Sequence, residues 1–171
     1  MHWKTLKRSW SSTMKKLCSD VLAALGTRTL VTAESCTGGG IGAELTAIPG
    51  SSANYKGGII CYTNWVKHHL LNVDDQLLDR VGPVSAPVAE AMASGAREAL
   101  CADVAVSVTG LAGPGGDDYG NTAGTVYIGY SDHNLTLSRE YHFSGDRNEV
   151  RKSACSEALK LVLHNMKQES D

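Results

Sequence analysis

Residues 30–45 constrain the fold most, because an apolar run passes directly into a turn and then into a helical pattern. Residues 30–32, Leu-Val-Thr, favour a strand. Residues 41–45 have helical spacing, and residues 35–40 between them are Ser-Cys-Thr and three glycines. Glycine lets the backbone turn sharply and approach a ligand closely. The stretch therefore predicts a strand that enters a helix through a tight turn.

The hydroxyl groups of this turn, on Ser35 and Thr37, have two interpretations. Either can cap the following helix, whose first amides lack partners within the helix. Ser35 can instead act as a nucleophile, with the same amides receiving an oxyanion or a phosphate. Cys36 is a rival nucleophile, although buried free cysteine is common in proteins. The turn by itself favours capping.

Helical and strand patterns alternate along the rest of the chain. We expect helices at residues 12–25, 41–47, 64–71, 74–81, 86–100 and 147–164, with Asn64 and Ser85 as N-caps. We expect further strands at residues 58–63, 103–109, 124–130 and 135–143, the first of them buried and the last two forming a hairpin. This alternation predicts an α/β fold with helices on both faces of a mixed sheet.

Three segments with polar or glycine residues follow predicted strands. They are the turn at Ser35, residues 62–67, and a loop that begins at Gly110 and contains five glycines. Ligands of α/β sheets bind beyond the carboxyl ends of the strands. We therefore expect the three segments to meet in one pocket.

Length and charge limit the class of protein. A chain of 171 residues fits one domain, and its net charge of −2 disfavours binding to nucleic acid through bulk electrostatics. We divide it into a flexible basic arm at residues 1–11, one domain at residues 12–166 and a tail at residues 167–171.

The cysteines indicate reduced thiols. No pair among the five has C-x-x-C spacing, so the sequence indicates neither a zinc site nor a disulfide framework; they are Cys18, Cys36, Cys61, Cys101 and Cys155. We find no signal-peptide pattern and no apolar run of bilayer length. We therefore expect a cytoplasmic protein without membrane contact.

Lys67 is the best candidate for a general base. It lies one turn into the predicted helix that follows Tyr62, near the end of a strand. A lysine kept from water loses its proton readily and can deprotonate a serine, as in Ser-Lys pairs. The plainer alternative is a surface lysine, and Tyr62 can orient the lysine, bind substrate or simply pack. A Ser-His-Asp triad fits poorly, because no obvious base position is held by His68, His69, His133 or His142.

The glycine loop and the start of the last helix add binding groups. The loop lacks the Gly-Lys-Ser/Thr ending of a P-loop, and we interpret Asp117 and Asp118 as turn residues, not metal ligands. Arg147 lies near a helix N-terminus, where a cation opposes the helix dipole unless an anion is nearby. Arginine there suits a phosphate or a carboxylate.

Four separated segments now resemble one family in the right order. They are residues 32–39 (TAESCTGG), residues 62–64 (YTN) with Lys67, residues 109–114 (TGLAGP), and residues 123–126 with residues 143–147. Together they resemble the CinA C-terminal-domain family, from about Met14 to Leu163. The chain is similar to the stand-alone form, without the N-terminal nucleotide-hydrolase domain of many members.

The resemblance implies a three-layer α/β/α domain with a mixed, mostly parallel sheet, which associates as a homodimer or higher homo-oligomer. It also implies an amidohydrolase that converts nicotinamide mononucleotide to nicotinic acid mononucleotide and ammonia without metal or cofactor. Ser35 would be the nucleophile, Lys67 the base and Tyr62 a supporting residue, with oxyanion donors near Gly38 or in the glycine loop. The implied substrate-binding residues are Thr37, Gly38, Gly39, Asn64, Thr109, Gly110, Gly113 and Arg147.

One position departs from the family pattern, because Trp65 stands where many members have an acidic residue. Two alternatives to an active enzyme stay open. One is an inactive pyridine-nucleotide-binding protein with the same pocket. The other is a competence-associated interaction protein that uses the basic arm, through Lys4, Lys7, Arg8, Lys15 and Lys16.

Overall fold

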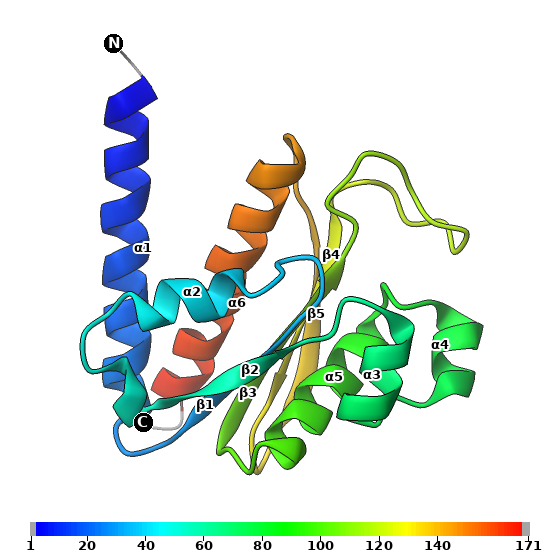
Figure 1. Cartoon of the computed structure of the whole chain (residues 1–171), viewed down its shortest axis with the longest axis horizontal. Coiled ribbons are helices and arrows are strands. Elements are labelled where there is room, and N and C mark those ends of the chain that lie inside the picture. Colours follow the sequence, from blue (N-terminus) through cyan, green and yellow to red (C-terminus); the bar gives the residue numbers. More distant parts are fainter. Residues whose placement is uncertain (1–2, 169–171) are drawn as a thin grey trace.

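Five strands form one mixed sheet in the order β2-β1-β3-β4-β5 (Figure 1). The computed structural model describes residues 3–168, with side chains from residue 11 onward. The strands are β1 Leu30–Glu34, β2 Tyr55–Ile60, β3 Val104–Gly110, β4 Thr125–Ser131 and β5 Thr136–His142. β1 pairs in parallel with β2 and β3, whereas β4 is antiparallel to both β3 and β5. Only β4 therefore runs against the other strands, which confirms a mixed, mostly parallel sheet.

Helices cover both faces of this sheet, so the three-layer α/β/α prediction is confirmed (Figure 1). One layer contains α1 Trp3–Leu25, α2 Gly40–Thr46 and α6 Arg147–Gln168. The other contains α3 Asn64–Leu71, α4 Asp75–Val81 and α5 Ala86–Ala99. Neighbouring residues of β3 point into different layers: Val106 packs with the first set of helices and Ala105 with the second.

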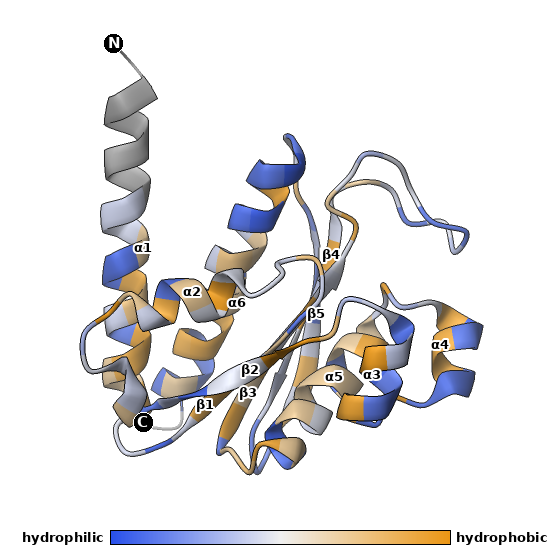
Figure 2. Cartoon of the chain, viewed as in Figure 1, coloured by the Kyte–Doolittle hydropathy of each residue, from blue (hydrophilic) through white to orange (hydrophobic). Residues whose placement is uncertain are grey.

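The central strands explain why the core forms here. β1 is buried along its whole length and β3 along nearly all of it, because helices lie on both sides. Figure 2 shows hydrophilic residues at the start of α6 and at the tip of the loop after β3. These two polar segments lie at the carboxyl end of β3, where the candidate site forms.

β2 differs from expectation, since it is an edge strand and not a buried one. Half-buried and exposed residues alternate along it, and Ile60 is 56% exposed. The strand also ends before residues 61–63, which the apolar run had suggested to be strand. Apolar composition cannot distinguish a central strand from an edge strand, because that depends on which strands pair.

The first helix begins at Trp3, well before the expected residue 12. The structure describes no side chains for residues 1–10, which make up nearly all of the expected basic arm. Residues 1–2 and 169–171, and with them most of the expected tail, lie outside the described residues altogether. The division into arm, domain and tail therefore stays a prediction. Within residues 3–168, no helix is both long enough and apolar enough to cross a membrane.

Candidate active site

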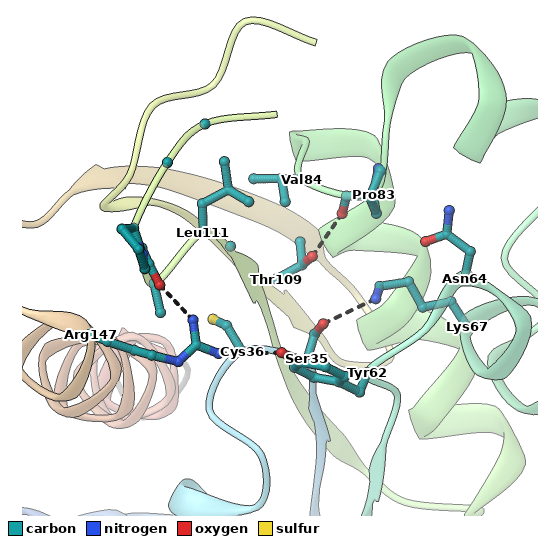
Figure 3. Close-up of a pocket in the computed structure, with 16 residues that line it drawn as sticks. Ser35, Cys36, Tyr62, Asn64, Lys67, Pro83, Val84, Thr109, Leu111 and Arg147 are labelled. Atoms are coloured by element: carbon teal, nitrogen blue, oxygen red, sulfur yellow. Dashed lines mark hydrogen bonds between the residues drawn. The ribbon is translucent and has the colours of Figure 1, made fainter. Parts of the chain in front are cut away.

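A cavity of about 330 Å³ lies beyond the carboxyl ends of β1, β2 and β3 (Figure 3). All three segments expected to converge contribute to its wall. Its lining residues are Ser35, Cys36, Tyr62, Asn64, Lys67, Pro83, Val84, residues 109–116 and Arg147. The predicted meeting of the serine turn, the segment after β2 and the glycine loop is therefore confirmed.

Ser35 is the first residue after β1. Its amide donates to the Val108 carbonyl at 2.9 Å, which continues the pairing with β3, and its carbonyl accepts from the Gly38 amide at 3.1 Å. The backbone thus turns immediately after Ser35. Its hydroxyl caps no helix: α2 begins only at Gly40, and the hydroxyl points toward Lys67 (Figure 3). The structure therefore favours the interpretation of Ser35 as a nucleophile over its interpretation as a helix cap.

Lys67 is buried beside Ser35. The Lys67 side chain is 2% exposed, and its Nζ lies 3.1 Å from Ser35 Oγ and 2.8 Å from the Cys61 carbonyl oxygen. Burial lowers the pKa of Lys67 below that of an ordinary lysine. Nζ donates to both oxygen atoms, and the neutral form of the amine has a lone pair that can accept the Ser35 proton. At this distance a base can take the proton of a nucleophile.

The α3 helix brings Lys67 to this place. Thr63 is its N-cap and accepts from the Val66 amide at 3.4 Å, so Asn64 is the first helical residue and not the expected cap. Lys67 is then one turn into the helix and faces inward. Ser85 does precede α5 as expected, but its hydroxyl donates to the Gly82 carbonyl and not to the helix end.

The thiols around the pair are neutral near neutral pH. Burial raises the pKa of Cys36 to about 11 and that of Cys61 to about 11. Cys36 lines the cavity, but the reactive thiolate form is rare at that pKa. Ser35, with a base at hydrogen-bond distance, is the better nucleophile.

Glu34 has a role that the sequence reading missed. Its buried carboxylate accepts from the amides of Gly39 at 3.0 Å, Ile41 at 3.1 Å and Gly42 at 2.9 Å. The N-terminus of α2 already holds an anion from the chain itself, with the favourable helix dipole. These amides are therefore not open to an oxyanion, contrary to the expectation for the helix start near Gly38. An acidic residue just before a glycine-rich helix start was the available signal.

Arg147 bridges two walls of the cavity at its rim. Its Nη1 donates to the Gly113 carbonyl at 2.7 Å and its Nη2 to the Tyr62 hydroxyl at 3.3 Å (Figure 3). Arg147 and Tyr62 are both exposed. Tyr62 thus contacts the arginine, and within the described residues it makes no hydrogen bond to Lys67. The arginine is placed where an incoming anion can reach it.

Thr109 and the glycine loop form the opposite wall. The buried Thr109 hydroxyl donates to the Pro83 carbonyl at 2.7 Å and so joins β3 to the segment before α5. Gly110 lies against the backbone of β4, where a side chain would collide. Farther along, the Asp117 carboxylate accepts from the amides of Tyr119 and Asn121, which confirms Asp117 as a turn residue.

Three predicted binding residues lie elsewhere. Thr37, Gly38 and Gly39 do not border the cavity. Thr37 faces a second cavity of about 130 Å³ between α1, α2 and α6, and its buried hydroxyl has no partner among the described residues. Arg151 borders this second cavity as well, and it was also missed from the sequence.

Trp65, the departure from the family pattern, does not enter the cavity. Its side chain is 63% exposed, and its ring stacks on that of His69 with the centroids 4.1 Å apart. Trp65 does not border the cavity either. The substitution therefore leaves the pairing of Ser35 and Lys67 intact.

Curated relatives share long stretches of this sequence. The CinA-like protein of Thermosynechococcus vestitus is 48% identical over 142 residues, which cover 81% of this chain and 34% of that protein. The CinA-like protein of Desulfotalea psychrophila is 40% identical over 157 residues, which cover 92% of this chain and 38% of that protein. The chain thus spans about a third of the length of these relatives.

Solved structures and a family model agree with this similarity. A competence-damaged protein (CinA) superfamily member from Klebsiella pneumoniae has a TM-score of 0.88 and 29% identity, covering 91% of this chain and 98% of that chain. The Escherichia coli superfamily member has a TM-score of 0.87 and 35% identity, covering 89% and 90%. The model of the CinA C-terminal domain matches residues 11–166. The chain therefore belongs to the CinA C-terminal-domain family.

Proposed function

We propose that the chain is a nicotinamide-nucleotide amidohydrolase, which converts nicotinamide mononucleotide and water to nicotinic acid mononucleotide and ammonia. The observation that carries this proposal is the buried pair of Ser35 Oγ and Lys67 Nζ, 3.1 Å apart, in a cavity with Arg147 at its rim. The family resemblance supplies the substrate. A cavity of about 330 Å³ is of a size that accepts small-molecule ligands.

The first chemical step is attack by Ser35 on the carboxamide carbon. Neutral Lys67 takes the hydroxyl proton while Oγ bonds to the carbon, and the carbonyl oxygen becomes an oxyanion. Lys67 then gives this proton to the leaving nitrogen, the C–N bond breaks, and ammonia departs. An ester of the nicotinic acid nucleotide remains on Ser35.

The second step releases this ester. Water attacks the ester carbonyl while Lys67 accepts one of the water protons. The bond to Ser35 Oγ then breaks, and Oγ recovers the proton from Lys67. The products are the free acid and an enzyme in its starting protonation state.

The amide of Cys36 is the proposed oxyanion donor. Within the described residues this amide donates to no oxygen atom, whereas those of Ser35 and Gly38–Gly40 all do, and Cys36 lines the cavity that contains Ser35. The amide that directly follows a serine nucleophile is a frequent oxyanion donor in hydrolases. Preorganised donors of this kind lower the barrier because they need no reorientation as charge develops.

Arg147 is the proposed phosphate-binding residue. Its present partners, the Gly113 carbonyl and the Tyr62 hydroxyl, carry no charge. A phosphate forms stronger, charge-assisted hydrogen bonds with a guanidinium and can displace them. We further propose, from the family resemblance, that the protein is cytoplasmic and forms a homodimer or higher homo-oligomer. The proposed reaction uses neither a metal nor a cofactor.

Ammonia release from nicotinamide mononucleotide tests the proposal. The wild type is compared with Ser35→Ala, Lys67→Ala and the matched control Cys36→Ala. We expect turnover by the wild type and by the control, and a loss of several orders of magnitude in the other two, because nucleophile and base act as a unit. Turnover that survives in Ser35→Ala contradicts the mechanism. Substrate binding without turnover in the wild type favours the inactive binding protein.

A further inference from the structure

Arg151 connects α6 to the turn that carries Ser35. Its Nε donates to the Cys36 carbonyl at 3.0 Å and its Nη2 to the Thr37 carbonyl at 3.2 Å. The Arg151 side chain is half-buried and borders the second cavity, not the one that contains Ser35. Arg151 therefore holds the turn from outside the candidate active site.

The turn is thus fixed by two opposite charges. Where the turn enters α2, Glu34 accepts hydrogen bonds from the backbone amides. Directly after Ser35, Arg151 donates to the two backbone carbonyls. Within the part of the chain that the structure describes, no backbone amide donates to the Cys36 carbonyl. Losing the guanidinium would leave this carbonyl without its protein partner.

The two carbonyl contacts set the orientation of two successive peptide groups. In a trans peptide the carbonyl of one residue and the N–H of the next point in opposite directions. Holding the Cys36 carbonyl toward Arg151 therefore turns the Thr37 amide away from Arg151. Holding the Thr37 carbonyl does the same for the Gly38 amide, which closes the turn onto the Ser35 carbonyl at 3.1 Å.

We propose that Arg151 is a positioning residue for Ser35, which holds the peptide groups after Ser35 so that the hydroxyl faces Lys67 and the Cys36 amide stays beside it. The inference rests on the proposed function and adds a residue that touches neither substrate nor Lys67. Misplacing a reacting group by about 1 Å can cost about 100-fold in rate. The two charge-assisted hydrogen bonds oppose such movement, because each is stronger than a bond between neutral groups.

Three variants isolate this role. Arg151→Ala removes both hydrogen bonds, whereas Arg151→Lys keeps the charge and one donor group. Lys152→Ala is the matched control: Lys152 is the next residue of α6 and borders the same cavity, but within the described residues it makes no hydrogen bond to the turn. Melting temperatures of all variants show whether they are folded.

Steady-state kinetics separate positioning from substrate binding. We expect Arg151→Ala to lower kcat by about 10- to 100-fold with little change in KM, since Arg151 is outside the cavity. Arg151→Lys should recover part of the loss, and Lys152→Ala should match the wild type. Wild-type kcat in Arg151→Ala, or an equal loss in Lys152→Ala, overturns the inference.

A readout without the nucleotide keeps this test separate from the proposed function. Phenylmethylsulfonyl fluoride labels a reactive serine: Oγ bonds to sulfur, fluoride leaves, and the base takes the hydroxyl proton. We expect labelling of Ser35 to be about tenfold slower in Arg151→Ala, partly restored in Arg151→Lys and unchanged in Lys152→Ala. If Arg151→Ala does not fold, the comparison of Arg151→Lys with Lys152→Ala decides. Unchanged labelling of Ser35 in Arg151→Ala overturns the role of Arg151, even if the wild type turns over the nucleotide. A wild type that does not turn over the nucleotide refutes only the proposed substrate and leaves the role of Arg151 to the labelling result.

Discussion

Gly95 of α5 lies directly against the backbone carbonyl of Leu71, the last residue of α3. A Cβ atom at position 95 would overlap that carbonyl oxygen. The contact allows α3 to pack closely on α5, and α3 carries Lys67. The position of the base therefore depends on a glycine that lies outside the cavity.

Gly95→Ala should lower both stability and activity. A glycine-to-alanine change inside a helix normally stabilises it by about 1 kcal/mol. Here the added methyl group pushes α3 outward, and overpacking of this kind costs about 1–3 kcal/mol. We expect a lower melting temperature and a lower kcat, measured by thermal unfolding and ammonia release. Glu98→Ala, at an exposed site of α5, should change neither, and a stabilised, fully active Gly95→Ala would refute the packing argument.

The activity should depend on pH through Lys67. Burial lowers its pKa below the ordinary value of 10.5, and the neutral form is the base. We therefore expect kcat/KM to rise with pH through this lowered pKa and to level off below pH 10.5. A pH profile of kcat/KM checks this. A rise of kcat/KM centred at the ordinary lysine pKa would contradict the burial of Lys67 away from water.

The same group makes stability depend on pH. The unfolded chain keeps the Lys67 proton up to about pH 10.5, whereas the folded chain releases it at a lower pH. Between these two pKa values the unfolded state binds more protons, so stability rises with pH. The free energy of unfolding of Lys67→Met, relative to wild type, should thus be highest at low pH and decline toward pH 10.5. Urea unfolding at several pH values measures it, and a difference independent of pH would contradict the linkage.

Cys36 should be dispensable and slow to react. Burial raises its pKa to about 11, so little thiolate exists near neutral pH. We expect Cys36→Ala to keep kcat within a few-fold of wild type. Iodoacetamide should label the exposed Cys101 before Cys36, which peptide mass spectrometry can follow. Rapid labelling of Cys36 with loss of turnover would instead identify the thiol as the nucleophile.

Arg147 should determine the preference for a phosphorylated substrate. Removing a charge-assisted hydrogen-bond donor costs about 1.5–3 kcal/mol, which corresponds to about 10- to 100-fold in affinity. We expect Arg147→Ala to raise KM for nicotinamide mononucleotide by this factor. The riboside, which lacks the phosphate, should be affected little and serves as the control. An equal loss for both substrates would assign Arg147 to ordering the glycine loop.

Much of this architecture could be predicted because its signals are local. Strand β1, the turn at Ser35 and the glycine loop each have a short pattern of apolar or glycine residues. Topology then brings strand ends together, so Ser35 and Lys67, 32 residues apart, could be placed in one pocket. The edge position of β2 was not predictable in this way, because it depends on strand order.

The contacts that fix the nucleophile were beyond the local signals. Arg151 and Cys36 are 115 residues apart, and a half-buried arginine on a helix has the same sequence pattern as a solvated one. The sequence analysis assigns no role to Glu34, because its three amide contacts form only once α2 folds back over it. Both residues satisfy backbone groups, which a sequence pattern does not reveal.

Trapping the acyl-enzyme tests the central claim most directly. Wild-type protein is mixed with nicotinamide mononucleotide, quenched in acid within the first turnovers, digested and examined by peptide mass spectrometry. The Ser-Lys mechanism predicts a nicotinic acid nucleotide ester on Ser35 in the wild type and no adduct in Ser35→Ala. An adduct on Cys36, or steady ammonia release from Ser35→Ala, would contradict it.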